Sequence, residues 1–201
     1  MTTWDERFRT GSYPTDADPS PVLREYLESI PDGRAMDVAT GPGRNAVFLA
    51  THGYVVDALD QSIEGLRIAR DRAVQQDAAD RLNLIRADVP SYAFPTARYD
   101  LVTISFYRAA DRLPDIIESL TQNGYLFMEH HLRSTESTPS GPSSDRYRFA
   151  ANELLRSTLG LTVLYYDETT SETEDGKRRA TARVLARRSS GSRQAYPDRP
   201  S

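Results

Sequence analysis

The sequence contains no cysteine and a single lysine, Lys177, although it has 25 basic residues in all. Without cysteine the chain has no disulfide, no thiolate nucleophile and no cysteine-ligated metal site, and we expect no metal centre. With only one lysine, a Schiff-base or general-base lysine is nearly excluded. These absences narrow the available chemistry before any motif is considered.

Long apolar runs are missing too, since no stretch approaches the roughly 18 residues that a membrane span needs. The first eight residues, Met-Thr-Thr-Trp-Asp-Glu-Arg-Phe, lack the apolar core of a signal peptide. We therefore expect a cytoplasmic protein with no membrane partner. The net charge of −4 argues against a nucleic-acid partner held by bulk electrostatics. A length of 201 residues, 38% of them hydrophobic, predicts one globular domain.

Strand and helix patterns alternate along most of the chain, which predicts an α/β fold with a parallel sheet and helices on both faces. Asp175-Gly176 between the last two strands predicts an antiparallel hairpin. The expected strands are Arg34–Ala39, Tyr54–Asp60, Leu82–Val89, Tyr99–Phe106, Gly124–His131, Leu161–Thr169 and Arg178–Arg187. The expected helices are Pro21–Ile30, Asn45–His52, Ile63–Gln76, Ala110–Leu120 and Ala151–Leu159.

Both ends of the chain lack such periodicity. Residues 1–19 are polar and aromatic, and we interpret them as a non-helical N-terminal arm. Its aromatic residues either form a lid over a ligand or fill a surface groove. Residues 20–188 form the predicted domain, and the Ser-, Pro- and Gly-containing residues 189–201 are expected to be disordered.

The most informative stretch is a glycine turn between the first predicted strand and its helix. Gly41-x-Gly43-x-x-Ala46 fits a dinucleotide-binding fingerprint, and Asp60 follows at the end of the next strand, where a carboxylate can accept hydrogen bonds from ribose hydroxyls. Glycine turns also occur for packing alone. Asp37 ends the first strand beside the turn, where its charge would repel a pyrophosphate and attract a cationic amine or sulfonium.

A third acid, Asp88, ends the third predicted strand. It either accepts a hydrogen bond from an adenine amino group or caps the turn before Pro90. Three acids at the carboxyl ends of neighbouring strands line the crevice where open α/β sheets bind ligands. Together they predict an adenosine site.

Several segments carry a resemblance to a known family. Asp37-Val-Ala-Thr-Gly-Pro-Gly-Arg-Asn, followed by the run from Leu49 to Asp60-Gln-Ser, resembles class I S-adenosylmethionine-dependent methyltransferases. Trp4-Asp-Glu-Arg-Phe, the Arg148 to Leu154 segment and a last strand ending in Leu-Ala-Arg are similar to the small tellurite-resistance-type members. The likeness covers residues 4–188. It implies a Rossmann-like, mostly parallel seven-stranded sheet with a C-terminal antiparallel hairpin.

The resemblance also implies a role for each matching position. It implies S-adenosylmethionine as cofactor, with Asp37 and the Gly41–Gly43 backbone at its methionine end and Asp60 at its ribose. Around the adenine and the sulfonium it implies Gln61, Asp88, Val89, Ser105 and Phe106. That group can carry a His-Arg pair in the final hairpin, whereas this hairpin holds Glu172, Glu174, Arg178 and Arg179 without histidine.

Candidate catalytic residues lie at or just after the ends of the fourth and fifth predicted strands: Tyr107, Arg108 and His130. Each has an ordinary alternative, because Tyr107 and Arg108 can form a packed turn, and His130 and His131 are expected to be solvated loop residues. Methyl transfer mainly needs alignment and exclusion of water, so the lack of an obvious catalytic dyad is consistent with it. The predicted acceptor is a small molecule, either a thiol, an oxyanion or a metabolite.

Three other functions use the same features. A nicotinamide-dependent oxidoreductase would share the glycines and the ribose acid, but it usually lacks an acid at the position of Asp37. A methyltransferase acting on nucleic-acid amino groups commonly has Asn/Asp-Pro-Pro-aromatic after the fourth strand, where this chain has Ser105-Phe-Tyr-Arg108. A catalytically silent cofactor-binding module remains an alternative, and the acceptor and oligomeric state stay open.

Overall fold

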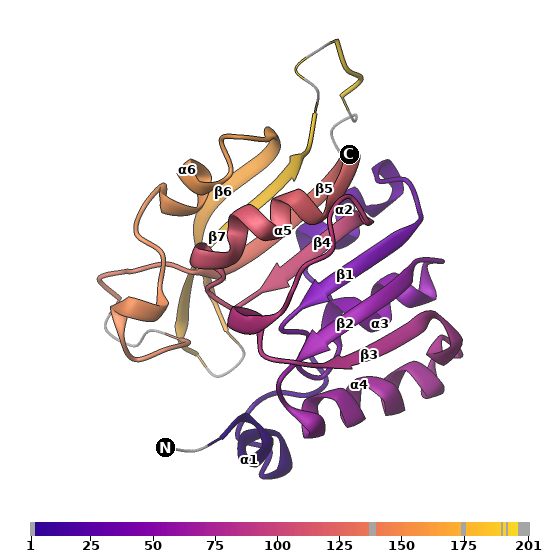
Figure 1. Cartoon of the computed structure of the whole chain (residues 1–201). Helices are drawn as coiled ribbons and strands as arrows, with labels where there is room; N and C mark the ends of the chain where they lie inside the picture. Colours follow the sequence, from indigo (N-terminus) through magenta and orange to yellow (C-terminus); the bar gives the residue numbers. More distant parts are fainter. Residues whose placement is uncertain (1–2, 137–139, 174–175, 190, 192, 197–201) are drawn as a thin grey trace.

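The computed structural model describes residues 3–136, 140–173, 176–189, 191 and 193–196. One seven-stranded sheet forms its centre, in the order β3-β2-β1-β4-β5-β7-β6 (Figure 1). The first five strands run parallel, and β7 lies antiparallel between β5 and β6. The strands are β1 (Arg34–Val38), β2 (Val55–Asp60), β3 (Leu82–Arg86), β4 (Tyr99–Ser105), β5 (Leu120–His131), β6 (Thr162–Glu172) and β7 (Arg178–Arg187).

Helices cover both faces of this sheet, as the alternating pattern predicts. One face packs against α2 (Pro21–Tyr26), α3 (Arg44–Thr51) and α4 (Ile63–Gln75). The opposite face packs against α5 (Leu113–Ser119) and α6 (Glu153–Ser157). The two buried clusters arise because successive strand residues point to opposite faces, so that Met36 and Val38 enter one cluster and Ala35 the other.

Several boundaries differ from the sequence prediction. The structure replaces part of the expected helix 110–120 with a short 3₁₀ turn, η4 (Ala110–Arg112), before α5. Strand β5 begins at Leu120, where its pairing with β4 shifts register. The remaining 3₁₀ turns are η1 (Leu27–Ser29), η2 (Ala79–Arg81), η3 (Val89–Ser91) and η5 (Asp145–Tyr147). The segment between β3 and β4 holds only the 3₁₀ turn η3, so this connection crosses the sheet without an α-helix.

The prediction of a non-helical N-terminal arm is wrong. Residues Trp4–Arg9 form α1, which begins with a capping box in which Thr3 Oγ accepts from the Glu6 amide and the Glu6 carboxylate accepts from the Thr3 amide. The helix packs on α4, and Phe8 is only 6% exposed. A short polar segment with one buried aromatic residue carries little periodic signal, so tertiary packing decides its conformation.

The described part of residues 189–201 touches the last two strands. The Arg187 guanidinium donates to Gln194 Oε1 at 2.6 Å, and Gln194 Nε2 donates to Thr162 Oγ1 at 3.0 Å. The other tail residues of the disorder prediction lie outside the described residues. Among the described helices, none is long and apolar enough to cross a membrane.

Candidate functional site

The glycine turn lies where the strand order reverses, between β1 and the neighbouring β2 and β4. Ala39, Gly41 and Gly43 all adopt positive φ angles, of 56°, 52° and 79°. Gly43 is also the residue before α3, and a methyl group there would lie 2.7 Å from Ala69 Cβ on α4. The turn therefore needs glycine at 43 both for its backbone and for close packing of two helices.

Asp37 lies at the base of this turn and is only 3% exposed. Its two carboxylate oxygens accept hydrogen bonds from Thr103 Oγ1 and Thr40 Oγ1, each at 2.6 Å. Burial raises the pKa of Asp37, and these two hydrogen bonds and the charge of Arg44 counteract that shift. Asp37 thus fixes the turn through Thr40 and places a buried negative charge beneath it.

Asp60 joins the second strand to the same turn. Its Oδ2 accepts from the Gly41 amide at 2.7 Å, and its Oδ1 accepts from the Ser62 amide at 2.8 Å. Burial is the largest influence on the Asp60 carboxyl and raises its pKa. The predicted ribose acid and the predicted glycine turn therefore form one continuous cradle, which suits a ligand with a hydroxylated ring beside a charged tail.

The other predicted contacts line the same edge. Gln61 and Asp88 are exposed directly after β2 and β3, and Val89 is buried. Burial raises the pKa of Tyr107, and the charges of Asp88 and Asp60 at this edge add to that shift. Ser105 accepts a hydrogen bond from Asn45 Nδ2 at 2.9 Å, which ties the end of β4 to α3.

Helix α1 covers this cradle. A methyl group on Gly41 would lie 3.4 Å from Phe8 Cζ, and one on Gly65 would lie 3.0 Å from Phe8 Cε2. Phe8 is part of an aromatic cluster with Trp4 and Tyr13, whose ring centroids lie 5.4–5.8 Å apart. Asp5 anchors α1 to the start of α4, because its carboxylate accepts hydrogen bonds from Ser62 Oγ at 2.5 Å and from the Glu64 amide at 3.2 Å.

A second group of charged residues, Arg44, Glu129 and Arg179, lies beyond the end of β4, and none of the three was a predicted site residue. Glu129 on β5 is 5% exposed, forms an ion pair with Arg44 and accepts from Ser20 Oγ at 3.0 Å. The guanidinium groups of Arg44 and Arg179 lie 5.2 and 5.5 Å from the centre of the Phe106 ring. The sequence signal that could have indicated Glu129 is a glutamate within a mostly apolar predicted strand.

The expectation that His130 and His131 are solvated loop residues is wrong. Both belong to β5 and are 2% and 7% exposed. Burial, assisted by neighbouring cationic groups, lowers the pKa of His130 to about 4 and that of His131 to about 3. His130 Nδ1 accepts from the His131 amide at 2.7 Å, and the His131 ring lies 4.7 Å from that of Phe106. Both imidazoles are therefore neutral at pH 7.

The three candidate catalytic residues, Tyr107, Arg108 and His130, do not form one cluster. Arg108 forms an ion pair with Glu153 and lies over the Phe149 ring, which also contacts His130. Tyr107 instead lies within electrostatic range of Asp88 and Asp60. Arg108 and His130 are thus brought together around Phe149, on the side of the sheet that α6 covers.

Comparison with known proteins places this geometry in context. A family model described as a methyltransferase domain matches residues 35–123. The ubiquinone/menaquinone biosynthesis C-methyltransferase UbiE of Ectopseudomonas mendocina is 32% identical over 80 residues, which are 38% of this chain and 31% of that protein. The curated relatives that match are longer, and the chain spans only 50% and 31% of their lengths.

Solved structures are similar over most of the chain. TehB from Haemophilus influenzae superposes with a TM-score of 0.72 and 18% identity, covering 92% of this chain and 67% of TehB. An S-adenosylmethionine dependent methyltransferase from Mesorhizobium loti has a TM-score of 0.64 and 19% identity, covering 84% and 96%. These structures share the Rossmann-like sheet with its antiparallel C-terminal strands.

Proposed function

We propose that this chain, which belongs to the class I S-adenosylmethionine-dependent methyltransferases, transfers a methyl group from that cofactor to a small-molecule acceptor. The observation that carries the proposal is the hydrogen bond between the Gly41 amide and the Asp60 carboxylate. It joins the glycine turn and the ribose acid into one cradle at the point where the strand order reverses.

In this proposal the cradle binds the cofactor through residues on three strand ends. The backbone of Gly41–Gly43 and the buried charge of Asp37 support the cationic methionine end, and Asp60 accepts from the ribose hydroxyls. Around the adenine and the sulfonium we assign Gln61, Asp88, Val89, Ser105 and Phe106.

S-adenosylmethionine supplies a methyl group on a positively charged sulfur, and the acceptor atom displaces that sulfur as the carbon–sulfur bond breaks. The protein has to align the acceptor and exclude water, and a nucleophile that is already ionised needs no strong base. The properties of His130 and His131 support transfer without a general base, because burial lowers their pKa values to about 4 and 3 and makes both weak bases. Helix α1 supplies the water exclusion, since Phe8 covers Gly41.

Among small molecules, the charges favour an acceptor with an anionic group. Arg44 and Arg179 both lie against Phe106, whereas one buried carboxylate, Glu129, pairs with Arg44. Within the described residues, the buried Nε of Arg179 has no hydrogen-bond partner. A buried cationic donor without a partner is costly, and an anionic acceptor would satisfy it. Of thiols, oxyanions and metabolites, this arrangement supports oxyanions and carboxylate-bearing metabolites.

The test measures binding and transfer with separate readouts. Calorimetry with S-adenosylhomocysteine should show saturable binding and calorimetry with NAD should show none. Methyl-labelled S-adenosylmethionine, incubated with a panel of thiols, oxyanions and metabolite carboxylates, should transfer label to an anionic member of that panel. Arg179→Gln should reduce this transfer at least tenfold and leave S-adenosylhomocysteine affinity unchanged.

Two results would contradict the proposal in different ways. Binding of NAD without any response to the sulfur cofactor would favour the oxidoreductase alternative. Tight S-adenosylhomocysteine binding without transfer to any panel member would favour a catalytically silent module. Arg178→Gln, which changes the neighbouring exposed arginine, is the matched control for Arg179→Gln.

A further inference from the structure

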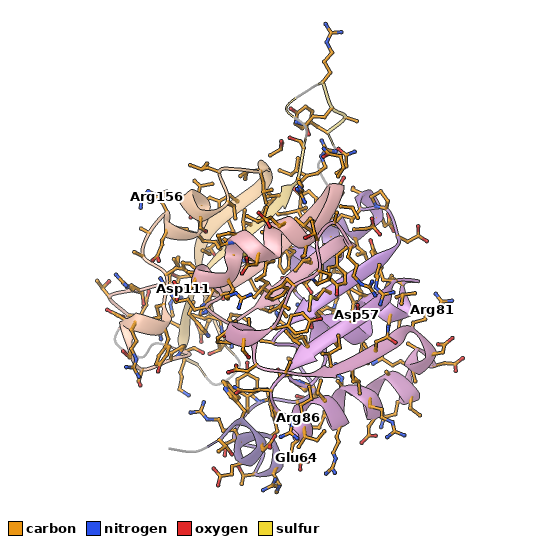
Figure 2. The ribbon with its side chains drawn as sticks, viewed as in Figure 1. Asp57, Glu64, Arg81, Arg86, Asp111 and Arg156 are labelled. Atoms are coloured by element: carbon orange, nitrogen blue, oxygen red, sulfur yellow. The ribbon has the colours of Figure 1, made fainter. Side chains whose placement is uncertain are left out.

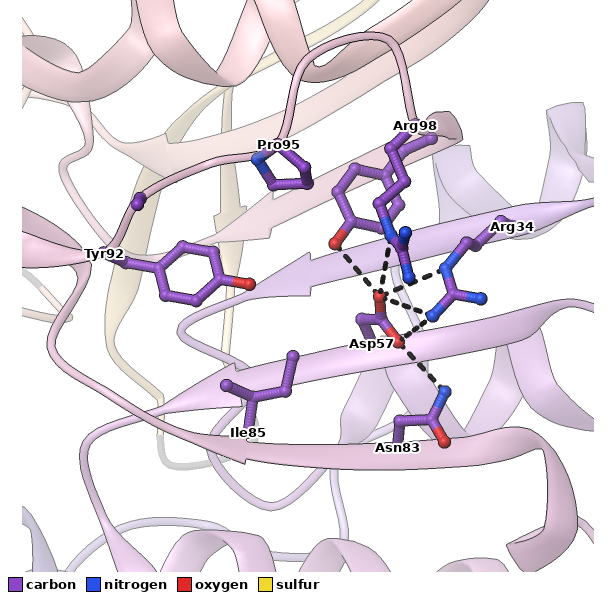
Figure 3. A pocket seen from close by; sticks show the side chains of 9 residues that line it. Arg34, Asp57, Asn83, Ile85, Tyr92, Pro95 and Arg98 are labelled. Carbon is purple, nitrogen blue, oxygen red and sulfur yellow. Dashed lines mark hydrogen bonds and ion pairs between the residues drawn. The ribbon is translucent and has the colours of Figure 1, made fainter.

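The connection between β3 and β4 contains no α-helix, and beside it the sheet carries an open pocket of about 480 Å³. Its floor is formed by the first half of four neighbouring strands, through Arg34, Asp57, Asn83 and Tyr99 (Figure 3). Its wall is the connection before β4. The volume lies within the range of small-molecule sites.

The pocket lies away from the cofactor cradle. Asp57 precedes Asp60 by three residues on β2, a distance of about 10 Å along the strand. In Figure 2, Glu64 and Arg86 lie near α1, whereas Asp57 lies on the sheet away from that helix. A ligand held here would therefore not replace the cofactor.

The polar end of the pocket has an excess of positive charge. The Asp57 carboxylate is 5% exposed and accepts from Arg34 at 2.8, 2.9 and 3.2 Å, from Asn83 at 3.0 Å and from the Tyr99 hydroxyl at 3.0 Å. Arg34 thus neutralises this carboxylate, which already accepts five hydrogen bonds. The second guanidinium, that of Arg98, forms a longer ion pair with the same carboxylate, at 3.8 Å, and is 47% exposed.

The N–H groups of the Arg98 guanidinium are therefore available to a ligand. Within the described residues its guanidinium makes no hydrogen bond, and the charged lining consists of two arginines and one aspartate. An arginine fork of this kind pairs best with the two oxygens of a carboxylate or a phosphate.

The opposite end of the pocket is apolar and aromatic. Ile85, Tyr92 and Pro95 line it, and Figure 3 shows the Tyr92 hydroxyl pointing across the pocket toward Asp57. A flat apolar group would pack between these side chains with its charged group toward Arg98.

The wall is held in place before any ligand arrives. Arg112 donates to the Tyr92 carbonyl at 2.8 Å and lies 5.4 Å from the Phe94 ring, which contacts Tyr92 edge-on. The amides of Ala97 and Arg98 donate to the carbonyls of Glu118 and Ser119 on α5, at 2.9 and 2.8 Å. A fixed wall lowers the entropic cost of binding.

We infer that this pocket is a second ligand site, which binds a small planar aromatic molecule carrying one carboxylate or phosphate group. Arg98 binds the anionic group, and Ile85, Tyr92 and Pro95 hold the aromatic body. The inference does not depend on the proposed methyl transfer.

The test uses 2-naphthoate, 2-naphthyl phosphate and the neutral 2-naphthamide as probes of the intact chain. Titration followed by backbone amide NMR should give saturable shifts at Asn83, Ile85, Tyr92 and Arg98 with at least one anion. The amide should bind at least tenfold more weakly. The ratio of the two anion affinities decides between carboxylate and phosphate.

Variants locate the site. Arg98→Gln and Tyr92→Ala should each weaken the binding of the preferred anion at least tenfold, with an unchanged melting temperature for Arg98→Gln. Arg70→Gln, which removes an exposed arginine on α4, should bind as the parent chain does. Equal binding by Arg98→Gln, no binding of either anion at millimolar concentration, or shifts confined to residues 37–43 would each overturn the inference.

Discussion

At the scale of single residues, Asp60 links ligand binding to the stability of the glycine turn. We expect Asp60→Ala to weaken S-adenosylhomocysteine binding by about 2–3 kcal/mol, because two ribose hydroxyls lose a charged acceptor. The same change leaves the Gly41 and Ser62 amides without their acceptor, so the free energy of unfolding should also fall. Calorimetry and urea unfolding measure the two effects, with Asp71→Ala, which changes an exposed aspartate on α4, as the control. Unchanged affinity would mean that another residue holds the ribose.

The buried histidines predict how stability depends on pH. The pKa values of His130 and His131 are lowered from 6.5 to about 4 and 3, so between about pH 4 and 6.5 the unfolded chain binds protons that the folded chain does not. Stability is therefore fully present above pH 6.5 and falls as the pH falls, by up to about 1.4 kcal/mol per pH unit for each histidine.

Urea unfolding at pH 4.5, 5.5, 6.5 and 7.5 measures this slope. A His130→Gln/His131→Gln double variant should have a flatter dependence below pH 6.5, even where its overall stability is lower. His52→Asn removes the exposed histidine at the end of α3 and should keep the parent slope. Parallel curves for the parent and the double variant would contradict the burial of these imidazoles.

At the scale of elements, the contact between α3 and α4 depends on Gly43. We expect Gly43→Ala to lower the free energy of unfolding by at least about 2 kcal/mol, since it adds backbone strain at a φ of 79° and a methyl group 2.7 Å from Ala69 Cβ. Denaturant titration measures the loss. Gly160→Ala, where added atoms meet open space, is the control and should change stability little. Similar values for both variants would show that the two helices can separate without cost.

Helix α1 is the element whose role we predict as a lid. Trp4 is the only tryptophan and contacts Phe8, which lies against Gly41. Its emission should therefore change when S-adenosylhomocysteine binds, and deletion of residues 1–13 should lower turnover more than it lowers stability. Fluorescence titration and thermal unfolding measure these effects. A flat emission at a cofactor concentration that calorimetry shows to be saturating would support a purely structural role.

At the scale of the whole molecule, the described C-terminal residues contact the end of the sheet where β6 begins and β7 ends. Arg187 is 7% exposed and donates to Gln194, which in turn donates to Thr162. We expect truncation after Arg188 to lower the melting temperature by a few degrees and to leave cofactor affinity unchanged, because the cradle lies at β1–β3. Gln194→Ala should reproduce part of that loss, whereas an unaltered melting temperature in both would show that the described contacts contribute nothing.

The sequence by itself determined the features that depend on neighbouring residues. Alternating apolar patterns predicted all seven strands and five of the six α-helices, and the Gly41–Gly43 turn with acids at successive strand ends predicted the cofactor edge. These signals are local, since a strand end or a glycine turn is encoded within a few residues. The division into residues 1–19, 20–188 and 189–201 stays a prediction.

Only the tertiary structure decided which distant residues meet. Glu129 pairs with Arg44 across 85 positions of the chain, and Phe8 reaches Gly41 because α1 docks on α4. The burial of His130 and His131 follows from the packing of β7 and the loops around β5, which no local pattern reports. The pocket beside Asp57 lies where one connection crosses the sheet without an α-helix, and its charge excess arises from Arg34 on β1, Asp57 on β2 and Arg98 in that connection. Burial and charge balance are sums over the whole fold, so they appear only when the strands are side by side.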